Sequence, residues 1–151
     1  MTDDEATTDE ADPTDDADGA VRGLGEVALR TEDLDAACDF YADVLRLPVL
    51  DRDDTSAFFE LGTGYGGHTE VLALFDRTGT DGYEPPATPR TTLDHLAFEI
   101  DRADFDAERE RLESLGYDLD TAYHDWVQWR SLYLRDPDGN RVELVCYDPE
   151  D

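Results

Sequence analysis

Two segments of the chain, 25–30 and 94–100, alternate apolar and polar residues as half-buried strands require. Their apolar faces carry Val27 and Leu29 in the first segment and Leu96, Phe98 and Ile100 in the second. Glu26 and His95 hold equivalent places on the polar faces, 69 residues apart. The period of two predicts that each segment buries one side and leaves the other to water or to a site.

A helix is predicted after each of these strands. Apolar residues recur at spacings of three and four between Leu34 and Leu45, and again between Phe105 and Leu115. Pro48 limits the first helix, and Gly116 stops the second. Each helix can therefore cover the apolar face of its own strand.

Three further strands are predicted in each half of the chain. They lie near residues 48–50, 57–61 and 68–75 in the first half and near 123–127, 131–134 and 141–147 in the second. Gly-rich and Asp-Gly turns favour hairpins between the last two strands of each half. The order β-α-β-β-β thus occurs twice and predicts an α+β fold. In it, two modules in pseudo-twofold arrangement form a cupped mixed sheet with helices on the outer face.

Composition predicts where the modules begin and end. Residues 1–20 are expected to form a disordered acidic tail, because they bury too little apolar surface to offset the entropy of ordering. The first module is predicted over residues 21–82, a Pro-rich linker over 83–91, and the second module over 92–149.

The charge of the chain is strongly negative. Its 151 residues include 40 acidic residues and no lysine, and the formal net charge is −28. This argues against a nucleic-acid partner and an anionic membrane surface, since both require clustered basic side chains. The composition resembles that of cytoplasmic proteins from extreme halophiles, in which molar salt screens self-repulsion.

Cysteine usage predicts a reduced, cytoplasmic location. Cys38 and Cys146 form no C-x-x-C motif, and the N-terminus is unlike a secretory signal. Both thiols are expected in the core, because each lies on an apolar stripe of its predicted element.

Two motifs are similar to those of the vicinal oxygen chelate superfamily, which includes glyoxalase I, bleomycin and fosfomycin resistance proteins and extradiol dioxygenases. The first is VALRTEDL at residues 27–34, followed by Phe40-Tyr41, and the second is LYLRDPDGNRVEL at 132–144. The resemblance covers about residues 22–149. It implies a divalent metal ion in the cup, with ligands from the first and last strands of each module. Those ligands are Glu26, Glu70, His95 and Glu143.

The implied site is rich in carboxylates. A histidine is commoner in the family where Glu26 stands, so this chain would offer one histidine and two or three carboxylates to Mn, Fe, Ni, Zn or Mg. The facing of Glu70 is open. Aligning the last strands of the two modules places Val71 opposite Glu143, whereas a bulge in the Gly66-Gly67 hairpin would turn Glu70 inward.

The leading hypothesis from this resemblance is a metal-dependent lyase or isomerase similar to glyoxalase I. The ion would bind neighbouring oxygens of a small substrate, and Glu143 or Glu70 would move a proton. The expected pocket residues are Arg30, Tyr123, Trp126, Trp129 and Tyr133, of which the four aromatic residues also fit an ordinary core. His68 and His124 have little support as site residues.

Two alternatives stay open. One is a metal-free protein that sequesters a small molecule, as bleomycin resistance proteins do, and the replacement of histidine by Glu26 favours it. The other is an extradiol dioxygenase, which lacks its second histidine here. The modules could pair within one chain or exchange between two chains of a homodimer.

Overall fold

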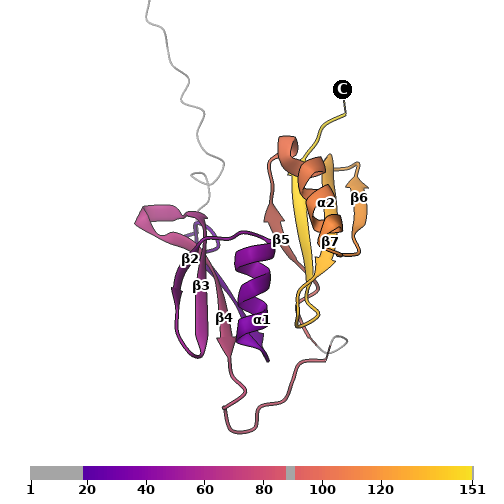
Figure 1. Cartoon of the computed structure of the whole chain (residues 1–151). Helices are drawn as coiled ribbons and strands as arrows, with labels where there is room; N and C mark the ends of the chain where they lie inside the picture. The colour runs from indigo at the N-terminus through magenta and orange to yellow at the C-terminus, as the bar shows by residue number, and fades with distance from the viewer. Residues whose placement is uncertain (1–18, 88–90, 151) are drawn as a thin grey trace, which may run out of the picture.

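The computed structural model describes residues 19–87 and 91–150, which form two four-stranded sheets and their helices (Figure 1). The strand orders are β1-β4-β3-β2 and β5-β8-β7-β6. In each sheet the first strand pairs in parallel with the last, and the other neighbours are antiparallel. The predicted α+β fold of two βαβββ modules is confirmed. The predicted tail and linker lie partly outside the described residues.

The elements follow the same order in both modules. The first contains β1 (Glu26–Thr31), α1 (Leu34–Cys38), η1 (Asp39–Val44), β2 (Val49–Arg52), β3 (Ser56–Thr63), η2 (Tyr65–Gly67) and β4 (Thr69–Asp76). The second contains β5 (Leu96–Glu99), η4 (Arg102–Asp104), α2 (Phe105–Ser114), β6 (Asp120–His124), β7 (Trp129–Arg135) and β8 (Arg141–Tyr147). The π-helical η1 continues α1, while η2 and η4 are short 3₁₀ helices. One boundary prediction was wrong: β6 ends at His124, and residues 125–128 form a turn where strand was expected.

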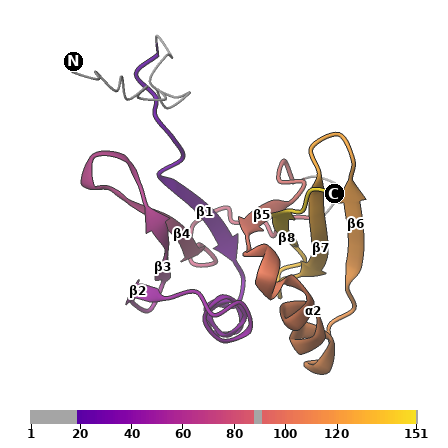
Figure 2. The same cartoon turned by 90° about the horizontal axis from the view of Figure 1, so that it is seen from above.

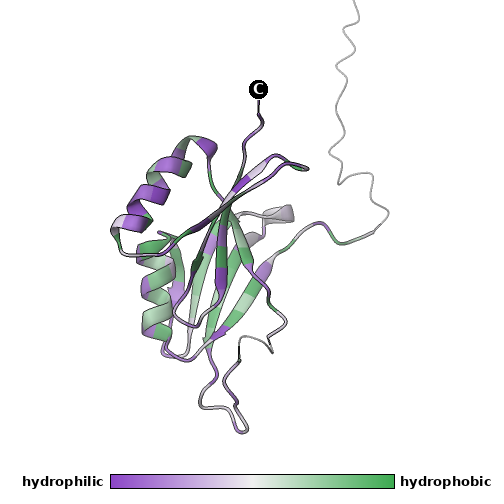
Figure 3. Cartoon of the chain, turned by 90° about the vertical axis from the view of Figure 1, so that its right-hand side faces the viewer, coloured by the Kyte–Doolittle hydropathy of each residue, from purple (hydrophilic) through white to green (hydrophobic). Residues whose placement is uncertain are grey.

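One apolar core runs through both modules. Leu29 and Leu74 of the first sheet, Tyr41 of η1 and Leu132 and Val142 of the second sheet belong to a single buried cluster. Figures 2 and 3 show the helices on one side of the molecule and the strands on the other. The sheet faces that point away from the helices are therefore left open by the described part of the chain.

Both cysteines lie in this core. Cys38 and Cys146 are buried free thiols, as predicted. Burial raises the pKa of each thiol, so both remain protonated. No helix of the described segments is long and apolar enough to cross a membrane.

A buried hydrogen bond joins the helix of the first module to the β7–β8 turn of the second. The Tyr41 hydroxyl donates to Oδ2 of Asp136 at 2.7 Å. Asp136 also accepts from the backbone N–H groups of Asp138 and Asn140, at 3.0 and 2.8 Å, and from the Asn140 side chain at 2.9 Å. The DPDGN turn thus folds around the carboxylate of Asp136, and the same carboxylate binds Tyr41 of the first module.

Candidate metal site on the open face of the second sheet

The open face of the second sheet brings together four side chains that could carry chemistry. His95 directly precedes β5, His124 ends β6, Tyr133 lies on β7 and Glu143 lies on β8. Tyr133 and Glu143 are direct partners in the β7–β8 register, so their side chains share a face. The period of two places His124 on that face as well, because it pairs with Trp129, four residues before Tyr133.

Glu143 is the buried member of the group. Its side chain is 8% exposed, and its Oε2 lies 3.3 Å from Nε2 of His95, whose side chain is 40% exposed. The other ring nitrogen of His95, Nδ1, lies 2.6 Å from Oδ1 of Asp94. The hydrogen bond from His95 lowers the pKa of Asp94, so Asp94 is an ionised acceptor and Nδ1 carries the donated proton.

This arrangement leaves two acceptors facing each other. In a neutral ring with its proton on Nδ1, Nε2 of His95 has only a lone pair to present to the carboxylate of Glu143. A proton or a cation is needed between Nε2 and Oε2, since neither atom can donate to the other. Nε2 of His95 and Oε2 of Glu143 could therefore serve as two of the ligand atoms of a metal ion.

Tyr133 holds the second oxygen of Glu143. Its hydroxyl lies 3.0 Å from Oε1 of Glu143 and 3.1 Å from Nε2 of His124. Burial, and then the bond to Glu143, raise the pKa of Tyr133, so the hydroxyl keeps its proton and can donate. The guanidinium of Arg141 lies 4.0 Å above the Tyr133 ring, and the His95 ring meets it edge-on at 6.4 Å.

The first module presents different groups at the equivalent places. Glu26 lies exposed at the start of β1, in the position that corresponds to His95. Ala28 pairs with Ala73 as Ala97 pairs with Glu143. The position equivalent to Glu143 is therefore Ala73, a residue without a donor atom.

Glu70 points to the other face of the first sheet. The register of β4 against β1 is unbroken, so Glu70 shares the face of Leu72 and Leu74, which pack in the core. The strand pairing is irregular in β3, between Glu60 and Gly62, rather than in the Gly66-Gly67 turn, and the alternation along β4 leaves Glu70 on the face of Leu72 and Leu74.

The structure thus brings together two of the four proposed ligands. His95 and Glu143 are in contact. Within residues 19–87 and 91–150 no group of three or more His, Cys, Asp or Glu side chains is placed to hold a metal ion. Glu26 and Glu70 of the same chain therefore do not complete the pair.

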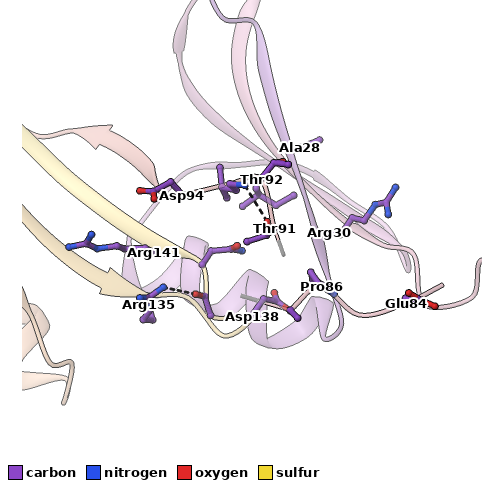
Figure 4. A pocket seen from close by; sticks show the side chains of 15 residues that line it. Ala28, Arg30, Glu84, Pro86, Thr91, Thr92, Asp94, Arg135, Asp138 and Arg141 are labelled. Atoms are coloured by element: carbon purple, nitrogen blue, oxygen red, sulfur yellow. Dashed lines mark hydrogen bonds between the residues drawn. The ribbon is translucent and has the colours of Figure 1, made fainter. Parts of the chain in front are cut away.

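The predicted pocket residues are dispersed. Arg30 lines a cavity of about 820 Å³ together with Asp94 and Arg141, and Figure 4 shows the two arginines pointing away from each other. Tyr123 lies on the helix side of the second sheet, where its hydroxyl donates to the carbonyl of Asp148 at 2.9 Å.

The aromatic residues of the β6–β7 hairpin lie near its tip. Trp126 is 85% exposed in the turn, and its ring lies 6.5 Å from that of Trp129 on β7. Of the five predicted pocket residues, Tyr133 is the one that contacts Glu143. His124, which had little support from the sequence as a site residue, lies next to Tyr133.

Comparison with known proteins identifies the family. A sequence profile of the Glyoxalase/Bleomycin resistance protein/Dioxygenase superfamily matches residues 23–144. The chain belongs to this superfamily. The predicted resemblance is therefore confirmed at the level of the superfamily, over nearly the whole described structure.

Relatives within this superfamily differ in activity. The chain is 26% identical to the metallothiol transferase FosB of Staphylococcus saprophyticus over 82% of this chain and 76% of that protein. Among solved structures, a lactoylglutathione lyase from Agrobacterium tumefaciens is 30% identical, with a TM-score of 0.61 over 84% of this chain and 95% of that one. A glyoxalase/dioxygenase from Nostoc punctiforme is 28% identical, with a TM-score of 0.64 over 89% and 96% of the two chains.

Proposed function

We propose that this protein is a divalent-metal-dependent enzyme of glyoxalase type, which acts on a small molecule that binds the ion through neighbouring oxygens. The observation that carries the proposal is the buried Glu143 carboxylate, 3.3 Å from Nε2 of His95. Two donors at this separation can both lie about 2.1 Å from one ion. One imidazole with carboxylates suits Mn, Fe, Ni or Zn, and a site richer in carboxylates admits Mg.

Similarity to named enzymes supports this class of function. A metallothiol transferase and a lactoylglutathione lyase are among the relatives of this chain. Both names are those of enzymes, and the word metallothiol in the first name refers to a metal. A catalytic role is therefore a better proposal than storage of a ligand.

In this proposal the third ligand is Glu26 of a second copy of the chain. Glu26 lies on the open face of the first sheet, in the place that corresponds to His95. Phe58 and Phe75 share that face, where they pack edge to face at 5.7 Å and remain half-buried. A second chain would cover this apolar surface while bringing Glu26 to the His95–Glu143 pair. Glu70 is left out, because it faces the core side of its sheet.

The residues would divide the chemistry between them. A divalent ion held by His95 and Glu143 would polarise the neighbouring oxygens of the substrate and stabilise negative charge on them. Glu143 would take a proton from the carbon beside those oxygens and return it to a neighbouring position. Asp94 would keep Nε2 of His95 free of a proton by accepting from Nδ1 at 2.6 Å.

The test is the metal content of protein purified in high salt without an affinity tag. Elemental mass spectrometry should find a near-stoichiometric transition metal in the wild type, and much less in His95→Gln and Glu143→Gln. His68→Gln is the matched control, since His68 is an exposed histidine next to β4 of the first module. Purified wild type that holds no metal and takes up none when ions are added would contradict the proposal.

A second candidate is a metal-free sequestering protein. The Trp126–Trp129 pair at the hairpin tip, with Trp126 85% exposed, favours it as an aromatic surface for a flat ligand. In that case tryptophan fluorescence would respond to such a ligand in the presence of a chelator, and Trp126→Ala would remove the response.

A further inference from the structure

We infer that His124 is a positioning residue: it donates to Tyr133, and Tyr133 in turn occupies Oε1 of Glu143, so that the carboxylate offers only Oε2 to a cation beside His95. This role rests on the proposed metal site and specifies how Glu143 would bind there. His124 lies in neither of the two motifs that the chain shares with the superfamily.

Counting protons sets the direction of this chain of hydrogen bonds. A tyrosine hydroxyl has one hydrogen to donate, and an ionised carboxylate can only accept. The 3.0 Å contact between Tyr133 and Oε1 of Glu143 therefore uses the hydroxyl hydrogen of Tyr133. The 3.1 Å contact between Tyr133 and Nε2 of His124 must then be donated by His124. His124 accordingly carries a proton on Nε2.

His124 acts on Glu143 through Tyr133 rather than by direct contact. Nε2 of His124 lies 4.0 Å from Oε1 of Glu143, which is too long for a hydrogen bond. A nitrogen that carries a hydrogen has no lone pair for a metal ion. In the Nε2–H tautomer, Nε2 of His124 therefore cannot bind an ion beside Glu143, but it can orient Tyr133.

The position of the Tyr133 ring is fixed on two further sides. The guanidinium of Arg141 lies over the ring at 4.0 Å from its centroid, and the His95 ring is nearly perpendicular to it, with 6.4 Å between the two centroids. Glu143 is only 8% exposed, so water has little access to replace the Tyr133 hydroxyl. The two oxygens of Glu143 consequently have different partners: Oε1 faces Tyr133, and Oε2 faces His95. Such outer partners of a ligand typically change metal affinity by about 10–100-fold.

Binding of Co²⁺, followed by visible absorption, tests this role. Tyr133→Phe and His124→Leu should each weaken Co²⁺ binding by about 10–100-fold. Both should also change the absorption spectrum, because Glu143 becomes free to bind through both oxygens. His124→Gln should restore the wild-type affinity and spectrum, since its amide can donate from a similar place. Tyr147→Phe is the matched control: this hydroxyl lies on β8 but donates to Gln128 at 3.1 Å.

Two results would overturn the positioning role. If His124→Leu binds Co²⁺ with the affinity and spectrum of the wild type, His124 does not position the ligand. If His124→Gln loses as much affinity as His95→Gln, His124 is itself a ligand. In both cases the wild type still binds Co²⁺, so the proposed metal-dependent function survives the failure of this inference.

A measurement without metal tests the hydrogen bonds of His124 independently of the proposed metal-dependent function. Long-range ¹H–¹⁵N correlation spectra of the imidazole rings, at a pH where they are neutral, should show His124 as the Nε2–H tautomer in the wild type. In Tyr133→Phe that preference should disappear. Wild type without Co²⁺ uptake would overturn the proposed function and the cation-directing role together, while the spectra still decide whether the hydrogen-bond chain exists. A wild-type His124 in the Nδ1–H form would refute that chain whatever the metal result.

Discussion

Replacing Tyr41 by phenylalanine should destabilise the protein by removing the buried bond between its two modules. Tyr41 is fully buried, and its hydroxyl donates to the Asp136 carboxylate at 2.7 Å. A hydrogen bond to a charged group contributes about 1.5–3 kcal/mol to stability. Asp136 keeps its bonds from Asp138 and Asn140, so the carboxylate is not stripped of donors. We therefore expect the lower part of the range, about 1.5–2 kcal/mol.

Urea denaturation in molar KCl, followed by tryptophan fluorescence, measures this loss without changing the screening of charge. A destabilisation of about 1.5–2 kcal/mol corresponds to a fall in Tm of about 3–8 °C for a chain of this size. Tyr83→Phe is the control, because the buried Tyr83 hydroxyl has no hydrogen-bond partner among the described residues and its removal should cost nothing. Equal stabilities for the two variants would refute the reasoning.

Three other outcomes are expected. Burial first, and Asp136 second, raise the pKa of Tyr41 in the folded protein, so the unfolded chain loses this proton first as the pH rises above about 10. Urea denaturation at increasing pH should then show the wild type losing stability faster than Tyr41→Phe, by up to about 1.4 kcal/mol per pH unit. Lowering KCl from molar to about 0.1 M lengthens the Debye length from about 3 to 10 Å, so a chain of net charge −28 should melt at a lower temperature in calorimetry. From the proposed metal-dependent function, a chelator should lower the Tm of the wild type but not of Glu143→Gln, because an ion at 100 times its Kd adds about 2.7 kcal/mol of stability.

The fold was predictable where the pattern is strict and the turn chemistry is explicit. Strand β8 runs from Arg141 to Tyr147 as predicted, because it is rich in apolar residues and follows an Asp-Gly turn. Strand β6 ends earlier than predicted, because the turn after it contains no glycine or proline. Gln128 instead adopts a left-handed conformation with φ 58°, which is uncommon for glutamine and could not be predicted from the sequence. The π-helical turn of η1 was also invisible to a pattern based on 3.6 residues per turn.

The contact between His95 and Glu143 in the second module was predictable, whereas the facing of Glu70 in the first module was not. His95 and Glu143 lie on the expected face and meet there. The facing of Glu70 depended on where one extra residue enters the sheet, and that residue lies in β3 rather than in the turn. His124 reaches Tyr133 only because the β6–β7 register pairs it with Trp129. That register follows from the turn whose position the sequence does not reveal.

The small side chain at Ala73 makes the two duplicated modules chemically unequal. The two modules repeat the same pairing, yet Ala73 stands where the second module has Glu143. Replacing a residue on the open face of the first sheet therefore leaves the contact between Glu143 and His95 intact. A substitution at Ala73 therefore alters the face of the first sheet without removing either member of the His95–Glu143 pair. The two halves of the repeated fold are thus equipped differently: His95 and Glu143 meet in the second half, and the place equivalent to Glu143 in the first half holds no polar side chain.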